Sequence, residues 1–384
     1  MDETVKHRPQ PQPKDKIIVS ERGMLDLPFL ILTVLLVAIG VIMMFSASFA
    51  RSYVEEGNST YYFARQGVFA VIGIGIMMLV SYVNYQLWRS LSFPILAASV
   101  VLLILVLLMG SSGGGAVRWL VIFGIRFQPS EVAKLGVVLS FAAMIAGYRD
   151  KMQTMKYGVI PFVAILTVMA GLLILEKHLS ATLIILALGA SMMFLGGTKL
   201  RWFGLGALVV AGAVLIYLNT MGYASDRIAA WKDPFSMAKD EGFQIVQSLY
   251  AIGSGGFMGL GLGKGRQKYL YLPEEHNDYI FSIVCEELGF VGAVLIILLF
   301  ILLIVRGYWI AMHSRDRFGA LVTAGLTTLL LLQVFLNIGV VTNFLPATGI
   351  SLPFFSYGGT ALLLQLFEMG IILNVSRSNK QNLI

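Results

Sequence analysis

Cysteine and charged side chains are scarce in this sequence of 384 residues. The single cysteine, Cys285, excludes an intrachain disulfide and a cysteine-based metal cluster. Charged residues make up 13% of the chain, whereas soluble domains contain about 25%. Hydrophobic residues make up 57%, and the mean hydropathy is +0.81. A surface soluble in water cannot be built from this composition, which predicts an integral membrane protein.

Several functional classes lack their signatures. The sequence contains no HExxH, GxSxG or Walker A motif and no Cys/His metal-ligand spacing. The net charge of +7 comes from Lys and Arg residues spread over short polar segments, without a continuous basic stripe. We therefore expect neither zinc or serine hydrolysis, nor ATP-driven transport, nor nucleic-acid binding.

Apolar stretches of about 20 residues are long enough to cross the hydrocarbon core of a membrane as helices. The uncharged stretch 318–367 is too long for one crossing, and Pro346, Gly349 and Pro353 predict a reversal within it. The sequence therefore predicts an all-α polytopic fold of about ten transmembrane helices. The predicted spans are residues 27–50, 66–88, 91–109, 129–148, 157–175, 179–198, 202–219, 278–305, 318–342 and 357–375.

Basic residues are concentrated in the segments on one side of these spans, which by the positive-inside rule is the cytoplasmic side. An even number of spans then places both termini in the cytoplasm, as a disordered tail at 1–22 and a short tail at 377–384. The membrane domain is predicted to cover 23–376, with a large extracytoplasmic loop at 220–277 between spans 7 and 8. A loop of this length is itself a sign of function.

The large outer loop contains a glycine-rich run at 253–265, followed by Arg266 and Lys268. Glycines allow the backbone to approach a ligand closely, so the run and its two cations could bind a phosphate or pyrophosphate. The alternative is that the glycines serve only turns and tight packing. Arg227 lies earlier in the same loop.

Acidic and basic residues near the outer ends of the spans are the candidates for chemistry. Asp278 could act as a general base at the membrane boundary, or could simply cap the helix that follows. Glu131 and Lys134 are three residues apart and can pair on one helix face that lines a cavity. Arg118 could bind a phosphate, and Trp119 could anchor the membrane interface.

Glu286 and Glu287 lie within the predicted span 278–305. Because ionised groups in a membrane need partners, we expect both carboxyl groups to form structural hydrogen bonds to other helices.

Four motifs carry a family resemblance: GAVRW at 115–119, QPSEVAK at 128–134, the long segment 242–281, and LPATGISLPFFSYGG at 345–359. The chain resembles the SEDS family (shape, elongation, division and sporulation), which includes FtsW, RodA and SpoVE. The residues of the last two motifs are more similar to the FtsW and SpoVE branch than to RodA.

The resemblance implies a peptidoglycan glycosyltransferase that polymerises lipid II at the outer face of the bacterial cytoplasmic membrane and releases undecaprenyl pyrophosphate. It implies a class B penicillin-binding protein as partner, within the division or elongation machinery, and it is compatible with a divalent cation such as Mg or Mn. By the same resemblance, Asp278 matches the catalytic base, and Arg118, Glu131 and Lys134 match positions that line the central cavity. Arg266 and Lys268 are weaker candidates for the leaving group.

One segment departs from the family pattern. Many relatives carry a Pro-Asp-x-Gly type sequence before the sixth span, where this chain has Glu176, Lys177, His178, Leu179 and Ser180. Either Glu176 or His178 could replace the missing acid. Two other functions also remain open, a lipid II flippase that forms no bond and a membrane scaffold that only recruits the penicillin-binding protein.

Overall fold

The computed structural model describes residues 23–113, 116–122, 124–208, 212, 229–239 and 242–378. The predicted tail 1–22, most of the predicted span 202–219 and the first part of the outer loop, including Arg227, lie outside these residues. Only the first two residues of the predicted tail 377–384 are described.

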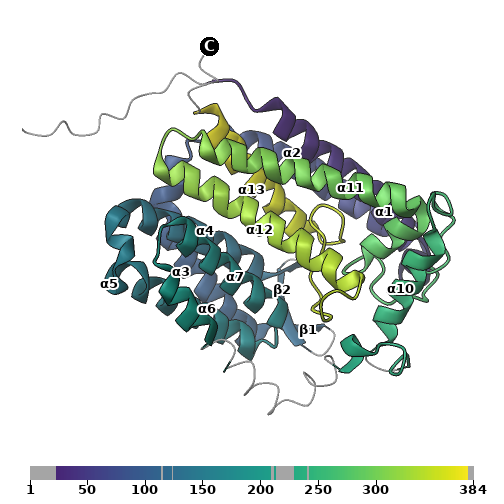
Figure 1. Cartoon of the computed structure of the whole chain (residues 1–384). Coiled ribbons are helices and arrows are strands. Elements are labelled where there is room, and N and C mark those ends of the chain that lie inside the picture. The colour runs from purple at the N-terminus through teal and green to yellow at the C-terminus, as the bar shows by residue number, and fades with distance from the viewer. Residues whose placement is uncertain are drawn as a thin grey trace, which may run out of the picture.

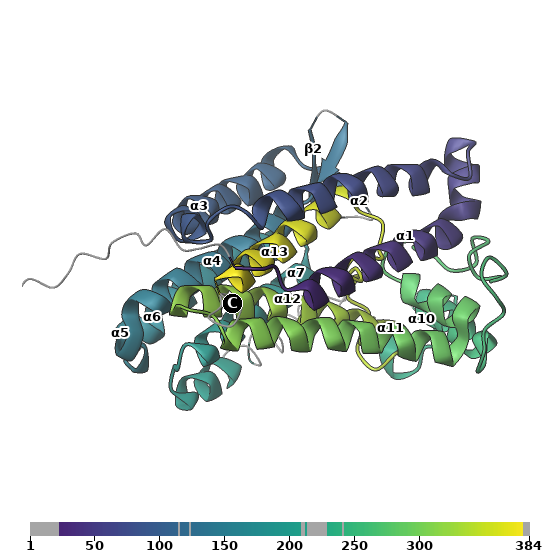
Figure 2. The ribbon, with the colours of Figure 1, turned by 90° about the horizontal axis from the view of Figure 1, so that it is seen from above.

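The described chain is an α-helical bundle (Figures 1 and 2). Its helices are α1 (Leu27–Glu56), α2 (Tyr61–Val80), α3 (Gln86–Met109), α4 (Pro129–Tyr148), α5 (Met155–Gly158), α6 (Ile160–Leu175), α7 (Leu179–Leu195), α10 (Phe243–Gly255), α11 (Ile280–Met312), α12 (Arg317–Val341) and α13 (Gly359–Arg377), with a 3₁₀ turn at Arg149–Gln153. Eight helical segments of the described residues are long and apolar enough to cross a membrane, and α7 is a shorter apolar helix. The protein is an all-α, polytopic membrane protein.

Local sequence signals define several helix ends. The side chain of Asp26 accepts a hydrogen bond from the Phe29 N–H and caps α1, which ends at Gly57 with φ 68°. Asp316 caps α12 in the same way. The predicted span 66–88 is wrong at its end, because α2 stops at Val80 and Trp88 already belongs to α3. Both helices are uncharged at this turn except for Arg89, so hydropathy alone could not locate it.

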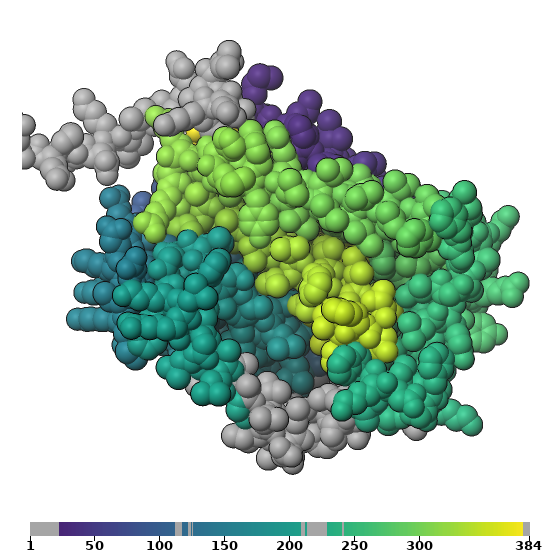
Figure 3. All heavy atoms as spheres, in the orientation of Figure 1, coloured from purple at the N-terminus to yellow at the C-terminus, as the bar shows by residue number. Residues whose placement is uncertain are grey.

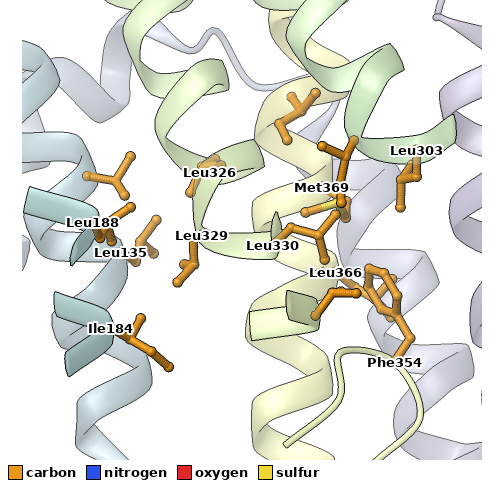
Figure 4. Close-up of a cluster of buried hydrophobic side chains, with 14 of the residues drawn as sticks. Leu135, Ile184, Leu188, Leu303, Leu326, Leu329, Leu330, Phe354, Leu366 and Met369 are labelled. Atoms are coloured by element: carbon orange, nitrogen blue, oxygen red, sulfur yellow. The ribbon is translucent and has the colours of Figure 1, made fainter. Parts of the chain in front are cut away.

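Three helices form the centre of the bundle. In the most apolar window of α4 and of α12, 72% of the residues are buried, and in α13 the share is 67%, whereas in α3 it is 22%. Figure 4 shows the packing around α12, where Leu329 faces Leu135 and Leu188 while Leu330 lies close to Met369 of α13. The charged residues of α4 are therefore surrounded by protein rather than by lipid.

The first and last described helices meet at one face of the bundle. The backbone N–H of Asp26 donates to the Ser376 hydroxyl at 3.2 Å, and Arg306 at the end of α11 pairs with the Asp26 carboxylate at 2.8 Å. Asp26 and Ser376 therefore lie at the same end of the bundle. The helix α10 and the residues before α11 lie at the opposite end (Figure 1).

A small antiparallel sheet connects α3 to α4 and was not predicted from the sequence. It consists of β1 (Ser111–Gly113), β2 (Ala116–Ile122) and β3 (Ile125–Phe127), in the order β1-β2-β3. Leu120 pairs with Phe127 across β2 and β3, and Gly124 supplies the positive φ of 77° at the turn between them. The sheet positions Arg118 on β2 and Arg126 on β3.

The segment between α12 and α13 follows an irregular path. It lies at the surface between the α6–α7 region and the α10 region, as yellow-green atoms in Figure 3. Gly349 within this segment has φ 69°, a conformation that favours glycine. The predicted reversal in the uncharged stretch 318–367 is confirmed at this segment.

Candidate functional site

Glu131 and Lys134 form an ion pair in the first turns of α4. The Lys134 Nζ lies 2.7 Å from the Glu131 Oε1, and the two side chains are only 3% and 13% exposed. Positions three apart on a helix lie on the same face, and pairing reduces the free-energy cost of burying each charge. The helix therefore presents a buried charge pair that remains in contact with a polar space.

This space is a small cavity with a volume of about 40 Å³. Four parts of the chain contribute to it: α4, the start of α7, α12 and the segment before α13. The lining residues are Gln128, Glu131, Lys134, His178, Ser180, Ala181, Ile184, Gln333, Gly349, Ile350 and Ser351. The lining is mostly polar, and a cavity of this size can hold one or two water molecules or part of a polar group.

Asp278 does not line this cavity, but its carboxylate lies against Gly349, which does. Its Oδ2 is so close to Gly349 that a Cβ atom at position 349 would lie 3.0 Å from it. The helix α11 begins only at Ile280, after Tyr279, which makes no capping bond with its side chain. Because Gly349 lines the cavity, its lack of a side chain leaves the Asp278 carboxylate close to the polar space.

Asn337 on α12 connects the residues before α11 to the segment before α13. Its Nδ2 donates to the Asp278 carbonyl at 2.8 Å and to the Ile350 carbonyl at 2.6 Å. The side chain is buried, so these bonds form in a low-dielectric environment. Sequence reasoning did not identify Asn337, although an amide within a long uncharged stretch is a usable signal.

Arg118 reaches from β2 to the turn between α6 and α7. Its Nη2 donates to the Lys177 carbonyl at 2.7 Å, and Lys177 has a positive φ of 55°. The guanidinium group thereby comes close enough to Glu176 and His178 to shift the pKa of each. Trp119 is half-buried on the same strand and does not belong to the cavity lining.

Glu176 and His178 are both neutral near pH 7, for the same physical reason. Burial raises the pKa of Glu176 to about 8, against the opposing effect of Arg118. Burial, together with the charges of Arg118 and Lys134, lowers the pKa of His178 to about 3. Of the two, His178 lines the cavity, so an uncharged imidazole stands where the resemblance leads us to expect a carboxylate.

The glycine-rich run binds carboxylates of its own chain. The N–H groups of Gly263 and Gly265 donate to the Glu287 carboxylate at 3.0 and 3.3 Å, and the Arg266 N–H donates to Glu286 at 2.7 Å. The structural hydrogen bonds expected for both glutamates are present, but they come mainly from this loop rather than from other helices. These donors are consequently not free for a phosphate.

Lys268 belongs to the same cluster. Its Nζ lies 2.7 Å from the Glu287 Oε1 and 2.9 Å from the Ser46 hydroxyl of α1, and the residue is 2% exposed. The Arg266 side chain is exposed. Neither residue lines the cavity, so the structure does not bring Arg266 and Lys268 together with Glu131 and Lys134. Asp278 and Arg118 also lie outside the lining.

Acidic and imidazole side chains of the described residues are the possible ligands of a divalent cation. Among them, no group of three or more His, Cys, Asp or Glu side chains is arranged to hold a metal ion. The Glu131 carboxylate is occupied by Lys134.

Comparison with known proteins identifies the family. A family model for FtsW, RodA and SpoVE, described as "Cell cycle protein", matches residues 27–381. The chain belongs to this family. All the residues of the cavity, and Asp278, lie within the part of the chain that the FtsW/RodA/SpoVE family model covers.

Two relatives in the family are similar over nearly their whole length. A probable peptidoglycan glycosyltransferase FtsW of Geobacter sp. (strain M18) is 38% identical over 354 residues, which cover 91% of this chain and 96% of the relative. Stage V sporulation protein E of Bacillus subtilis (strain 168) is 37% identical over 358 residues, with coverage of 92% and 98%.

Solved structures show the same family fold. A chain from a structure described as "Structural coordination of polymerization and crosslinking by a peptidoglycan synthase complex" has a TM-score of 0.78 and 29% identity, and the match covers 93% of this chain and 99% of that one. The rod shape determining protein RodA of Thermus thermophilus has a TM-score of 0.70 and 28% identity, with coverage of 93% and 98%.

Proposed function

We propose that this protein is a peptidoglycan glycosyltransferase that polymerises lipid II at the outer face of the bacterial cytoplasmic membrane. The observation that carries the proposal is the Asp278 carboxylate beside Gly349, which lines a polar cavity together with Lys134. The names of the FtsW relatives support the reaction class. The resemblance to FtsW and stage V sporulation protein E favours wall synthesis in division or a related process.

Asp278 is the general base of the proposed reaction. It takes the proton from the sugar 4-hydroxyl of one lipid II molecule, and that oxygen attacks C1 of the sugar on a second lipid-linked chain. A new glycosidic bond forms, the bond from C1 to the diphosphate oxygen breaks, and undecaprenyl pyrophosphate leaves with the bonding electron pair. The proton remains on Asp278 until it is released to water.

Positive charge near the cavity stabilises the leaving diphosphate. Arg118 carries a guanidinium group, which matches the geometry of phosphate oxygens, and Lys134 lines the cavity in an ion pair with Glu131. The neutral state of Glu176 and His178 avoids repulsion of the diphosphate at neutral pH. The proposed site thus combines one base with two basic residues nearby.

A crosslinking enzyme is the proposed partner. The related chain in the peptidoglycan synthase complex comes from a structure in which polymerization and crosslinking are coordinated. By resemblance, the crosslinking partner of this chain is a class B penicillin-binding protein. Polymerised glycan would then pass directly to the transpeptidase.

The decisive experiment measures glycan polymers formed from lipid II by the purified protein with its partner. We expect Asp278→Asn to abolish polymer formation, because the amide cannot accept the hydroxyl proton. Glu56→Gln is the matched control, since Glu56 is an exposed acid at the end of α1. Full activity of Asp278→Asn would remove the base assignment.

Two other outcomes would favour the alternative functions. Movement of lipid II across vesicles without formation of polymer would favour the flippase. Unchanged assembly of the complex, with no polymerisation by the unsubstituted protein, would favour the scaffold.

A further inference from the structure

The helix α11 is interrupted near its start, at Gly289. This glycine has φ 67° and ψ −168°, which is outside the helical region. In an unbroken helix each N–H donates to the carbonyl four positions earlier, so the break deprives the N–H groups of Phe290 and Val291 of their helical acceptors. The carbonyls of Glu286 and Glu287 lose their helical donors for the same reason. Four backbone groups therefore need other partners.

The glycine-rich run 253–265 supplies all four partners. The hydrogen bonds run from the N–H of Phe290 to the carbonyl of Gly256 (3.0 Å), from Val291 to Phe257 (3.2 Å), from Leu260 to Glu286 (3.0 Å) and from Gly261 to Glu287 (2.9 Å). The approach is so close that a Cβ atom at Gly289 would lie 2.2 Å from the Gly259 nitrogen. The run thus takes the place of the missing helical hydrogen bonds of α11.

The break lies at a depth that the hydrocarbon core of a membrane reaches. At the other end of α11, Arg306 pairs with Asp26 and lies over the Trp309 ring, and such basic and aromatic residues are typical of a membrane boundary. At about 1.5 Å per residue, Phe290 lies about 24 Å along the helix from Arg306, and the hydrocarbon core is about 30 Å thick. Backbone groups at this depth must be satisfied inside the protein, as those at the break are.

The rest of the run is also satisfied from within the chain. The N–H groups of residues 259–261 and 263–267 all donate to acceptors of the protein, either backbone carbonyls or the carboxylates of Glu286 and Glu287. An irregular segment is excluded from hydrocarbon mainly by the cost of its unpaired backbone groups. This run can therefore contact lipid although it is not a helix.

Large apolar side chains cover the outside of the run. Phe257, Met258 and Leu262 are 64%, 75% and 56% exposed. The Phe257 ring stacks on the ring of Phe290, with 6.0 Å between the centroids. Phe290 and Ile301 are both exposed and lie about 20° apart around α11, on one face of that helix. The apolar surface of the run therefore extends the face that α11 presents to lipid.

We propose that the outside of the glycine-rich run is embedded in the membrane leaflet at the α10 end of the bundle, which is the outer leaflet in the predicted orientation. Its lipid-contact surface consists of Phe257, Met258, Leu260 and Leu262. The exposed basic residues Lys264 and Arg266 follow this surface, and such a combination is typical of elements that lie in the membrane interface. The inference goes beyond the proposed reaction and does not depend on it.

Spin labels on the run test this location directly. The native Cys285 is buried and is replaced by alanine, so that a label attaches only to a cysteine introduced as Met258→Cys or Leu262→Cys. Each labelled full-length protein is reconstituted into vesicles of phosphatidylethanolamine and phosphatidylglycerol. Collisions of the label are then measured with oxygen, which concentrates among acyl chains, and with a nickel chelate, which stays in water.

Two exposed positions serve as matched controls. Leu302→Cys, on α11 between Phe290 and Arg306, is the lipid control, and Glu56→Cys, at the end of α1, is the water control. We expect oxygen collisions to outnumber nickel collisions at positions 258 and 262, as at the lipid control. The water control should show the reverse. If Met258→Cys fails to fold, Leu262→Cys reports on the same surface.

Two outcomes overturn the proposal. Nickel collisions that outnumber oxygen collisions at the run, as at the water control, would place it in water. Loss of collisions with both reagents when the crosslinking partner is added would assign the surface to a protein contact instead of lipid. If Cys285→Ala fails to fold, the native cysteine is retained because it is buried, and the parent protein treated with the label is the blank.

Discussion

The side-chain amide of Asn337 donates a hydrogen bond of 2.8 Å to the backbone carbonyl of Asp278. The same nitrogen donates to Ile350 at 2.6 Å, so one buried side chain on α12 joins the residues before α11 to the residues before α13. The proposed base and the glycine beside it therefore keep a fixed separation. A base must be positioned within hydrogen-bonding distance of the hydroxyl that it deprotonates.

Replacement of Asn337 tests this positioning. We expect Asn337→Ala to lower kcat about tenfold or more while KM changes less, because Asp278 is displaced but the cavity remains. The loss of two buried hydrogen bonds should also lower the free energy of unfolding by about 1–3 kcal/mol. Ser191→Ala, which removes a hydroxyl bonded within α7, is the control. Equal losses of kcat in both variants would argue against a specific role for Asn337.

A side chain at position 349 should impair the reaction. Gly349→Ala would place a methyl group 3.0 Å from the Asp278 Oδ2 and would hold a residue other than glycine at φ 69°. We expect a cost of about 1–2 kcal/mol from the backbone and a large loss of polymerisation from crowding of the carboxylate. Gly75→Ala on α2 meets no atom within 4 Å and should leave activity intact. Normal polymerisation by Gly349→Ala would contradict the proposed approach to Asp278.

The pH dependence of activity should involve Glu176. Because its pKa is about 8, we expect the unsubstituted protein to lose polymerisation as pH rises past 8, when a new negative charge appears near Arg118. Glu176→Gln should match it at pH 7 and retain activity at pH 9. An identical alkaline limb in both proteins would assign that limb to another group.

Stability provides the complementary measurement for Glu176. Burial raises the pKa of Glu176 in the folded state from its usual value of 4.5 to about 8, so the folded state binds the proton more tightly than the unfolded state does. The free energy of unfolding therefore falls as the pH rises from 4.5 to about 8. The Glu176→Gln variant has no proton to lose at this position, so its stability lacks this dependence on pH. The difference between the two unfolding midpoints in detergent should therefore increase over that pH range, in favour of the variant.

Lys268 should matter for folding rather than for substrate affinity. We expect Lys268→Met to lower the free energy of unfolding by about 3–5 kcal/mol, because it leaves the buried Glu287 carboxylate without its cation. Adding Glu287→Gln should recover part of this loss. The KM of the folded fraction should stay near normal, and a KM raised in parallel with kcat loss would instead return Lys268 to the substrate site.

The helical fold could be predicted from the sequence, because long apolar stretches have few alternatives in a membrane. Helix ends were less accurate where no charge or cap marked them, as between α2 and α3. The small sheet carrying Arg118 and Arg126 was missed, since short strands without clear alternation resemble loops.

The site was predictable in part. The pairing of Glu131 with Lys134 follows from helical spacing, and the ion pair is present. The contact of Asp278 with Gly349 depends on how distant segments pack, which no local pattern encodes. The placement of Arg118 against the α6–α7 turn has the same origin.

The glycine-rich run was predicted to bind a phosphate, and it does bind an anion, but the anion is a carboxylate of the chain itself. Its backbone N–H groups do bind an anion, as glycine-rich loops often do. Two adjacent glutamates in an apolar helix required donors, so the pairing could have been inferred by asking which loop supplies them.

Because the carboxylates of Glu286 and Glu287 are part of the chain, the loop at 253–265 holds its anion permanently. Its shape should not depend on whether substrate is plentiful or exhausted, and phosphate added from solution has no vacancy to fill there. The outer surface built on this loop is therefore the same in the resting protein as during turnover.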